Sequence, residues 1–296
     1  LKECVEKKIK AVVIISAGFS EIGESGRKLE EKCKKIVERK NIRVLGPNVI
    51  GVYDSSTAVD TLFLSRDRMQ RPPQGSIAFI SQSGAVGSTI LDWLAEEKIG
   101  ISKFVSYGNA MDVNEADLLE FFANDEKTKV VVVYLEGIRS GGKEFIAVAK
   151  KIAKKKPIIV LKAGKTEKGT RAVLSHTGSL AGSAKIYSSV FKQTGIIEAN
   201  SFEELFDFAR AFSQPLPKGS RVAIITDGGG FGVLAADECE RQKLHLPEPS
   251  KKLKQKFKKI FPSYVIVGNP IDLTGDATAE RYQVAMEECL RSSEYD

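Results

Sequence analysis

This chain has few of the residues on which several protein classes depend. Its 296 residues include four cysteines, which lie far apart and form no CxxC pair, so we expect neither a disulfide framework nor a zinc site. No apolar run approaches the roughly 18 residues that a membrane span needs, and the apolar run at residues 11–15 is too short for a secretory signal. These scarcities predict a cytoplasmic protein that binds no metal and no membrane.

Positive charge exceeds negative charge, with 45 lysines and arginines against 38 acidic residues and a net charge of +7. The basic residues are interleaved with glutamates, as in residues 28–40. The densest basic stretch, residues 251–259, carries Leu253 and Phe257 at helical spacing. It predicts an amphipathic surface helix, so we expect no nucleic-acid partner. The excess positive charge suits the attraction of phosphorylated ligands.

Short β-branched runs alternate with amphipathic stretches, a pattern typical of parallel α/β architecture. The expected strands are residues 11–15, 43–45, 76–80, 103–106, 130–135, 157–161 and 221–225. The expected helices include residues 26–40, 84–98, 184–193, 202–212 and 233–242. A proline pair at 72–73 and the proline-containing segment 213–219 mark boundaries. They divide the chain into residues 1–72, 73–214 and 218–296.

The second and third parts both begin with a strand, a turn of small residues and a helix. The turns are Ser81-Gln82-Ser83-Gly84 and Asp227-Gly228-Gly229-Gly230. Such turns let backbone N–H groups converge at the positive end of a helix dipole, which is what a phosphate site needs. One such turn is weak evidence, because any α/β domain has several. Two of them on either side of a histidine-containing loop are more specific.

The chain has two histidines. His245 lies where a helix gives way to a strand and a proline, and we expect no chemistry from it. His176 lies within a long loop expected over residues 164–182, flanked by hydroxyl residues and glycines. Imidazole can attack a phosphoryl group when a carboxylate holds one of its nitrogens. The residues alone leave two interpretations open, a phosphoryl carrier or an incidental histidine in a capping loop.

The histidine segment Ser175-His176-Thr177-Gly178-Ser179-Leu180-Ala181-Gly182 resembles the phosphohistidine loop of the NDP-forming acyl-CoA synthetases. This superfamily includes succinyl-CoA synthetase and the archaeal ADP-forming acetyl-CoA synthetases, and this chain looks most like the α portion of the latter. Further motifs that match in the expected order are residues 46–51 (GPNVIG), 80–85 (ISQSGA), 107–109 (YGN), 135–137 (LEG), 226–232 and 268–273 (GNPIDL).

The resemblance implies a fold and an activity. The fold would be α/β, with a partial Rossmann-like CoA-binding domain followed by two flavodoxin-like ligase domains, the second truncated. The activity would be that of an acid–thiol ligase, which interconverts acyl-CoA, ADP and phosphate with acid, CoA and ATP. An acyl phosphate and a phosphohistidine would be the intermediates. CoA or acyl-CoA would bind as substrate.

The resemblance also implies roles for particular residues. His176 would carry the phosphoryl group, and Glu136 would orient it from the end of a buried strand. The proposed phosphate-binding residues are Ser83, Gly84, Gly229 and Gly230. The proposed CoA-binding residues are Ser16, Gly18, Phe19, Pro47 and Asn48. Gln82 and Asn109 are weaker candidates for substrate contact.

Some parts of the family pattern are missing. Val49 stands where many relatives have cysteine, and no ATP-grasp sequence or glycine-rich opening of the CoA-binding domain is present. We therefore expect an excerpt of something longer, unable to complete the reaction alone. Its expected partner is an ATP-grasp β subunit or fused domain that binds ADP or ATP with Mg²⁺, in a hetero-oligomer of the α2β2 type.

Three alternatives remain. A succinyl-CoA synthetase α subunit would end near Phe212, whereas this chain continues to Asp296. A non-catalytic acyl-CoA-sensing module, as in some protein acetyltransferases, often lacks the loop histidine, whereas His176 and Glu136 are both present here. A dinucleotide-binding oxidoreductase is disfavoured, because no GxGxxG follows a strand with a later ribose-binding acid.

Overall fold

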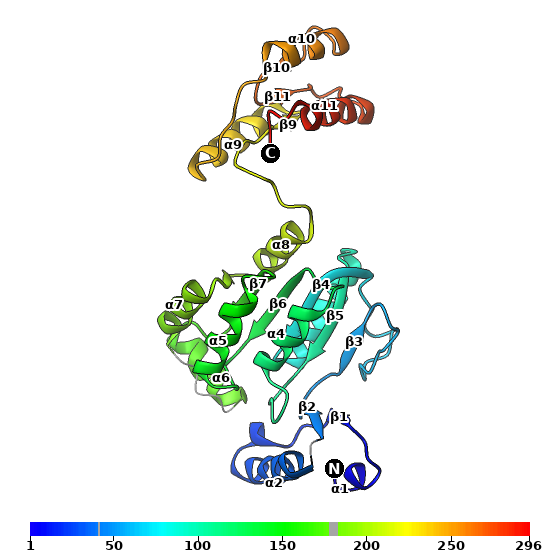
Figure 1. Cartoon of the computed structure of the whole chain (residues 1–296), viewed down its shortest axis with the longest axis vertical. Coiled ribbons are helices and arrows are strands. Elements are labelled where there is room, and N and C mark those ends of the chain that lie inside the picture. Colours follow the sequence, from blue (N-terminus) through cyan, green and yellow to red (C-terminus); the bar gives the residue numbers. More distant parts are fainter. Residues whose placement is uncertain (41, 178–182) are drawn as a thin grey trace. The chain divides into compact units, whose positions relative to one another are not determined.

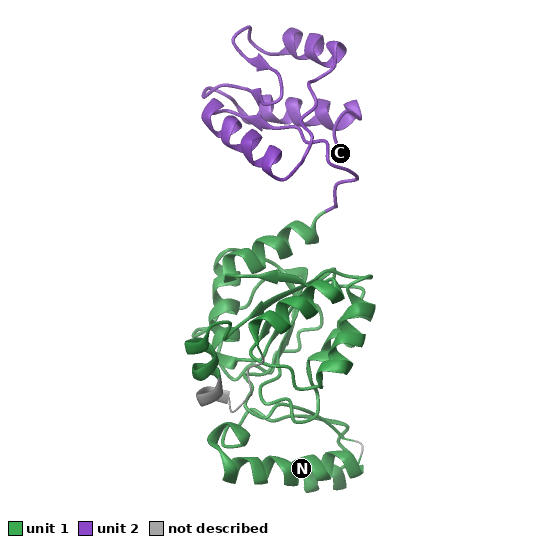
Figure 2. Ribbon diagram, turned by 90° about the vertical axis from the view of Figure 1, so that its left-hand side faces the viewer, with its two compact units in different colours: residues 1–214 green, residues 215–296 purple. Residues whose placement is uncertain are grey.

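The computed structural model describes the chain except residue 41 and residues 178–182, and it also excludes the side chains of residues 174–177. The described residues form two compact units, residues 1–214 and 215–296 (Figure 2). Each unit has its own hydrophobic core.

The N-terminal segment of unit 1 contains a small parallel sheet. Its elements are α1 (Lys2–Glu6), β1 (Ala11–Val13), η1 (Ser20–Ile22), α2 (Glu24–Lys40) and β2 (Arg43–Leu45). β1 pairs with β2 in parallel, with Val12 opposite Val44. Both strands and the helix between them agree with the prediction, although β1 ends two residues earlier than expected.

The centre of unit 1 is a six-stranded sheet in the order β3-β5-β4-β6-β7-β8. Its strands are β3 (Val52–Asp54), β4 (Gln74–Ser81), β5 (Ile101–Ser106), β6 (Val130–Leu135), β7 (Ile158–Lys162) and β8 (Ile197–Ala199). All neighbours are parallel except β3 and β5, which are antiparallel. The sequence predicted β4, β5, β6 and β7 but not the two three-residue edge strands.

Helices cover both faces of this sheet (Figure 1). They are α3 (Gly84–Glu96), α4 (Glu115–Asn124), α5 (Gly142–Ile152), α6 (Glu167–Thr177), α7 (Ala184–Thr194) and α8 (Phe202–Ser213). Alternate residues of β6 enter two separate cores, with Val132 in the cluster that contains α3 and α8 and Val133 in the cluster that contains α4, α5 and α7. This doubly covered parallel sheet confirms the predicted α/β class with a flavodoxin-like arrangement.

Helix α6 corrects one expectation, because residues 167–177 were predicted to lie in a loop. Thr166 accepts a hydrogen bond from the Gly169 N–H at 3.1 Å, and the Thr170 hydroxyl donates to the Gly164 carbonyl at 3.0 Å. Glu167 lies in the first turn, where a carboxylate interacts favourably with the helix dipole. These local contacts let the segment form a helix despite its glycine and threonines.

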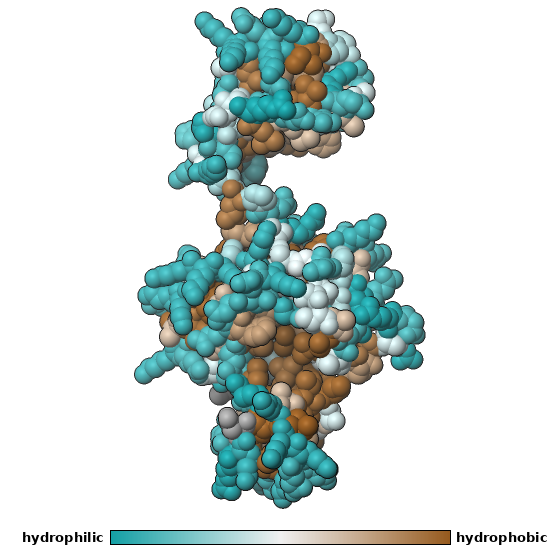
Figure 3. All heavy atoms as spheres, turned by 45° about the vertical axis from the view of Figure 1, so that its right-hand side comes forward, coloured by the Kyte–Doolittle hydropathy of each residue, from teal (hydrophilic) through white to brown (hydrophobic). Residues whose placement is uncertain are grey.

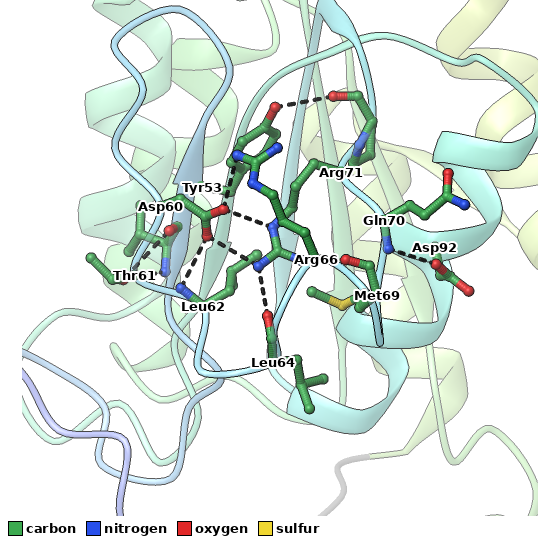
Figure 4. A network of polar contacts seen from close by, with 12 residues as sticks. Tyr53, Asp60, Thr61, Leu62, Leu64, Arg66, Met69, Gln70, Arg71 and Asp92 are labelled. Atoms are coloured by element: carbon green, nitrogen blue, oxygen red, sulfur yellow. Dashed lines mark hydrogen bonds and ion pairs between the residues drawn. The ribbon is translucent and has the colours of Figure 1, made fainter.

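The connection between β3 and β4 is fastened by a polar network (Figure 4). The Arg71 guanidinium is almost fully buried and bonds Asp60, with Nε 2.9 Å from one carboxylate oxygen. Arg71 also donates to the Leu64 carbonyl at 2.7 Å, and Arg66 contacts Asp60 at 3.2 Å. Tyr53 donates to the Pro72 carbonyl at 3.1 Å. This connection is therefore ordered by buried charge pairing in the absence of regular secondary structure.

Unit 2 is built on shorter strands. Its elements are β9 (Ile225–Thr226), α9 (Gly229–Arg241), α10 (Lys251–Ile260), β10 (Ile266–Val267), β11 (Ile271–Asp272) and α11 (Ala279–Ser292). β11 pairs in parallel with β9 and antiparallel with β10. The strand expected at residues 221–225 is mostly absent, since only Ile225 belongs to β9 and Arg221 makes an isolated bridge with His245.

The basic stretch forms the amphipathic helix that the sequence predicted. In α10, Leu253 and Phe257 are buried, whereas Ile260 is exposed.

On the face of unit 1 drawn in Figure 3, apolar side chains gather in one area and hydrophilic side chains cover most of the remainder. Within the described part of the chain, no helix combines the length and apolar character that a membrane crossing requires.

Candidate active site

A cavity of about 370 Å³ lies in unit 1 at the carboxyl ends of the central strands. Ligand sites of open parallel sheets form at this edge, because the loops that follow the strands diverge there. The lining residues come from both the N-terminal segment and the six-stranded domain: Ile15, Ala17, Asn48, Val49, Ile50, Phe63, Gln82, Ser83, Gly84, Ala85, Gly108, Asn109, Glu136 and Arg139.

One wall of the cavity is the first turn of α3. The hydroxyl of Ser81, at the end of β4, donates to the Ser83 carbonyl at 2.7 Å, and the Ser83 side chain caps the helix by accepting from the Val86 N–H. At Gly84, an added Cβ would lie 2.8 Å from the Ile50 Cγ2 atom, so a side chain does not fit without movement. The turn therefore presents backbone N–H groups and a helix dipole, which together favour a bound anion.

Glu136 follows β6 directly and is buried, with 6% of its surface exposed. The Gln82 Oε1 atom accepts hydrogen bonds from the N–H groups of Glu136 and Gly137 at 2.7 and 2.9 Å. This contact joins the ends of β4 and β6 and fixes the backbone that carries the carboxylate. Burial, reinforced by the Glu136 carboxylate, raises the pKa of Tyr134 to about 12.

A buried lysine lies behind Glu136. Lys162, the last residue of β7, is 3% exposed and donates to the carbonyls of Glu136, at 2.9 Å, and Ala163. Its ammonium lies 4.6 Å from the centre of the Tyr187 ring. Burial lowers the pKa of Lys162 to about 8, although the Glu136 carboxylate opposes that shift. Lys162 therefore ties the ends of β6 and β7 together.

Asn48 and Asn109 meet on another wall of the cavity. Asn48 Nδ2 donates to Asn109 Oδ1 at 3.4 Å, and the Asn109 N–H donates to the Pro47 carbonyl at 3.0 Å. Gly108 approaches this turn so closely that an added Cβ would lie 2.3 Å from the Asn48 carbonyl oxygen. Asn109 Nδ2 also donates to Glu21 Oε2 at 2.6 Å. The GPN and YGN motifs thus form one contact, which the sequence did not predict.

The other residues proposed for CoA binding surround this contact and are not part of the cavity wall. The Ser16 carbonyl accepts from the Asn48 N–H at 3.0 Å. The N–H groups of Gly18 and Phe19 both donate to Glu21 Oε1. Pro47 follows a cis peptide bond. Of the five residues proposed for CoA binding, Asn48 lines the cavity.

Sequence reasoning missed two residues of this region. Glu21 joins the Gly18 turn to Asn109, and the hydrogen bonds that it accepts from Asn109 and from the Gly18 turn outweigh burial and lower its pKa. Arg139 lines the cavity. Arg139 could have been predicted from its position three residues after Glu136, because residues that follow a strand end lie at the same edge of the sheet.

Three of the proposed residues are not among those that line the cavity. Gly229 and Gly230 begin α9 in unit 2, where an added Cβ would lie 2.8 Å from Asp272 Oδ2 at Gly229 and would meet nothing within 4 Å at Gly230. The backbone of His176 belongs to α6, which packs beside η1, but its side chain and residues 178–182 lie outside the described residues. Among the residues that the structure describes, no group of three or more His, Cys, Asp and Glu side chains could hold a metal ion.

Comparison with known proteins identifies the family to which the chain is similar. Residues 74–212 match the family model of the succinyl-CoA ligase like flavodoxin domain, and residues 222–294 match that of the ligase-CoA domain. The chain is 46% identical over 282 residues to the α subunit of acetate–CoA ligase [ADP-forming] II from Pyrococcus furiosus, covering 95% of this chain and 60% of the relative. It is 48% identical over 281 residues to acetate–CoA ligase [ADP-forming] from Methanocaldococcus jannaschii, covering 95% of this chain and 39% of the relative.

A solved structure shares the fold over the whole length of the chain. The dinucleotide-forming acetyl-coenzyme A synthetase 1 of Ca. Korarchaeum cryptofilum, solved with phosphate and ADP, matches with a TM-score of 0.89 and 41% identity. The match covers 100% of this chain and 63% of that protein. The chain thus spans less than two thirds of the length of these relatives.

Proposed function

Because the chain belongs to the superfamily of NDP-forming acyl-CoA synthetases, we propose that it is the α portion of an ADP-forming acyl-CoA ligase. The reaction interconverts acyl-CoA, phosphate and ADP with acid, CoA and ATP. The relatives named above support this assignment, since they are acetate–CoA ligases [ADP-forming]. The alternative of a non-catalytic sensor is not favoured by these matches.

The proposed reaction has three balanced steps. Phosphate attacks the thioester carbonyl of acyl-CoA, so that a C–O bond forms, the C–S bond breaks and CoA leaves as the thiol after taking up a proton. The acyl phosphate then transfers its phosphoryl group to a ring nitrogen of His176 and releases the acid as its carboxylate. Finally the phosphohistidine transfers the phosphoryl group to ADP, which gives ATP and regenerates the imidazole.

The cavity in unit 1 is the proposed site of the first two steps. Backbone N–H groups of Ser83 and Gly84 bind the phosphoryl oxygens, as helix N-termini do for other anions. Glu136 holds one nitrogen of His176, which makes the other nitrogen the nucleophile. The observation that carries the proposal is that the α3 turn, Glu136 and the Asn48–Asn109 pair line one cavity.

CoA binding is proposed for the loops of the N-terminal segment. Ser16, Gly18, Phe19, Pro47 and Asn48 lie in the connections that follow β1 and β2, and these are the edges where dinucleotides and similar ligands bind parallel sheets. Asn48 would then lie closest to the thioester, because it lines the cavity. The acyl group stays unassigned, since relatives are named for acetate and for 4-hydroxybutyrate.

The last step would use parts outside these 296 residues. We propose that an ATP-grasp domain, on a separate β subunit or in the same polypeptide, binds ADP or ATP with Mg²⁺. Gly229 and Gly230 would bind phosphate at the start of α9 in unit 2. We also propose the division into residues 1–72, 73–214 and 218–296, an α2β2-type assembly and a cytoplasmic location.

A labelling experiment tests the proposal. The full-length protein with its ATP-grasp partner is incubated with γ-³²P-ATP and Mg²⁺, and the chain is tested for a label that is acid-labile and base-stable. We expect label on the wild type, none on His176→Ala and less on Glu136→Gln. His245→Ala is the matched control, because His245 is exposed and bonds Ser220 and Val222 through its backbone.

Two results of this experiment would contradict the proposal. If the wild type binds CoA but takes up no label, the chain is not a phosphoryl carrier and the sensor interpretation replaces the ligase. If His245→Ala loses the label and His176→Ala keeps it, the carrier has been assigned to the wrong histidine.

A further inference from the structure

Gln82 is buried in the cavity wall and is only half paired. The residue is 5% exposed, and its Oε1 atom accepts the two backbone hydrogen bonds from Glu136 and Gly137. Its Nε2 atom is shielded from solvent and has no hydrogen-bond partner within the described part of the chain. A buried donor without an acceptor is destabilising, and such groups are rare in folded proteins unless they serve a purpose.

The orientation of the amide is determined by its surroundings. If oxygen and nitrogen were exchanged, the NH2 group would face the N–H groups of Glu136 and Gly137, and three donors would meet with no acceptor among them. The two contacts therefore hold the acceptor end toward the backbone after β6. The donor end is left without a partner in a side chain that belongs to the cavity wall.

We propose that Gln82 Nε2 donates a hydrogen bond to a carboxyl or phosphoryl oxygen of the reacting acyl phosphate. This inference rests on the proposed function and deepens it, because it assigns a neutral donor to the substrate oxygen. A neutral donor suits this position, since it recognises an oxygen acceptor without adding a charge beside the Glu136 backbone. The same side chain thus fixes the backbone of Glu136 and contacts the substrate.

The step in which this donor acts is the transfer between phosphohistidine and the acid. In the acid-consuming direction a carboxylate oxygen attacks phosphorus, the P–N bond to His176 breaks, and the acyl phosphate forms with no further reactant. An N–H donor placed beside the carboxyl group orients the attacking oxygen. Loss of the donor therefore slows this step.

Two substitutions separate the acceptor of Gln82 from its donor. Gln82→Glu keeps an oxygen for the N–H groups of Glu136 and Gly137 but removes the donor, whereas Gln82→Met removes both. Each full-length protein, with its ATP-grasp partner, is first labelled with γ-³²P-ATP. The label is then discharged with CoA and a panel of acids that includes acetate and 4-hydroxybutyrate. We expect both variants to discharge the label that they carry with a rate constant at least about tenfold below that of the wild type, the effect of losing one hydrogen bond to a charged group.

Gln82→Met controls for the charge that Gln82→Glu introduces, because it removes the donor without adding a carboxylate. We expect both variants to discharge more slowly than the wild type. An effect on the KM for the acid assigns the acceptor to the carboxyl group, and an effect on the KM for phosphate in the reverse reaction assigns it to the phosphoryl group.

The results that overturn the inference are distinct from failure of the proposed function. If Gln82→Glu discharges within twofold of the wild type, Gln82 serves only to hold the backbone. If Gln82→Glu discharges slowly while Gln82→Met discharges normally, charge alone explains the effect. If the wild type itself takes up no label, the proposed function fails and not the assignment of Gln82.

Discussion

Unit 1 and unit 2 each contain a corner, in which a strand, a short turn and a helix follow one another. The two corners share one local hydrogen bond but have different surroundings. In unit 1, the hydroxyl of Ser81 at the end of β4 donates to the Ser83 carbonyl at 2.7 Å, and α3 begins at the next residue. In unit 2, the hydroxyl of Thr226 at the end of β9 donates to the Gly228 carbonyl at 3.0 Å, and α9 begins at the next residue. In both corners a strand-end hydroxyl shapes the turn and leaves the helix N-terminus open.

The surroundings decide what each corner can do. The corner of unit 1 lies beside buried Gln82 and Glu136, which the ends of neighbouring long strands hold in place. The corner of unit 2 follows a two-residue strand, and α9 exposes Phe231 and Leu234, which are 74% and 65% accessible. A helix N-terminus favours anion binding in either corner. Phosphoryl transfer also needs side chains from the ends of neighbouring strands, and the corner of unit 1 has these.

The largest expected effect tests that difference directly. Glu136→Gln should slow phosphorylation of His176 by acyl-CoA and phosphate by about 10²–10⁴-fold, because the imidazole loses the carboxylate that orients it. Asp227→Asn, the matched change after β9, should slow it only slightly. Single-turnover labelling of both variants measures the rates. Equal losses would mean that the two corners are equivalent and would remove the distinction drawn here.

The next prediction compares a buried ion pair with an exposed one. Arg71→Ala should lower the free energy of unfolding of unit 1 by about 3–5 kcal/mol, because it leaves Asp60 without its buried partner. Arg221→Ala, which breaks the exposed Arg221–Asp296 pair in unit 2, should have a much smaller effect. Urea unfolding followed by the fluorescence of Trp93, the single tryptophan, reports on unit 1. Hydrogen exchange resolves the change in unit 2, and an equal loss in both units would contradict the prediction.

The free energy of unfolding of unit 1 should depend on pH through the ionisation of Lys162. Its pKa is lowered to about 8 by burial, so between pH 8 and its ordinary value of 10.5 the unfolded chain holds a proton that the folded chain has lost. The free energy of unfolding of the wild type should therefore rise with pH over this window, by about 3 kcal/mol relative to Lys162→Met. Glu136 opposes the shift and Lys165 adds to it. A constant difference between the two proteins from pH 7 to 10.5 would show that burial leaves this lysine unaffected.

The smallest expected effects come from two glycines at matched corners. Gly84→Ala should destabilise unit 1 by about 1–2 kcal/mol, because the new Cβ would lie 2.8 Å from Ile50 Cγ2. Gly230→Ala meets nothing within 4 Å and should stabilise α9 by about 0.5–1 kcal/mol. Thermal unfolding monitored by hydrogen exchange in each unit gives both values. A stabilising Gly84→Ala would mean that the α3 corner has more room than its contacts indicate.

The sequence predicted the long buried elements well, and the reasons are physical. β6 begins and ends at the predicted residues, because a run of four valines followed by Tyr134 and Leu135 belongs in a strand that is covered on both faces. β2 was also predicted at its observed bounds. The edge strands β3 and β8 were missed, since three residues carry too little pattern and their pairing depends on distant partners.

Other features could not be predicted because they depend on tertiary contacts. The loop expected around residue 170 is the helix α6, whose start is set by the local hydrogen bonds of Thr166 and Thr170. The hydrogen bond from the Glu136 N–H to Gln82 Oε1 joins residues 54 positions apart, and no local sequence pattern predicts it. Motif order indicated which residues gather at the cavity, but the motifs did not show that half of the Gln82 amide would be left unpaired.

The most direct test of the account leaves out the nucleotide. The wild-type protein and its Glu136→Gln variant are mixed with ³²P-phosphate and, in parallel, with acetyl-CoA, 4-hydroxybutyryl-CoA or feruloyl-CoA, without ADP. The account predicts that at least one acyl-CoA places label on His176 of the wild type, and that Glu136→Gln is labelled far more slowly. If His176 is labelled by ATP but by none of these acyl-CoA substrates with phosphate, the cavity beside Glu136 is not where the acyl phosphate forms.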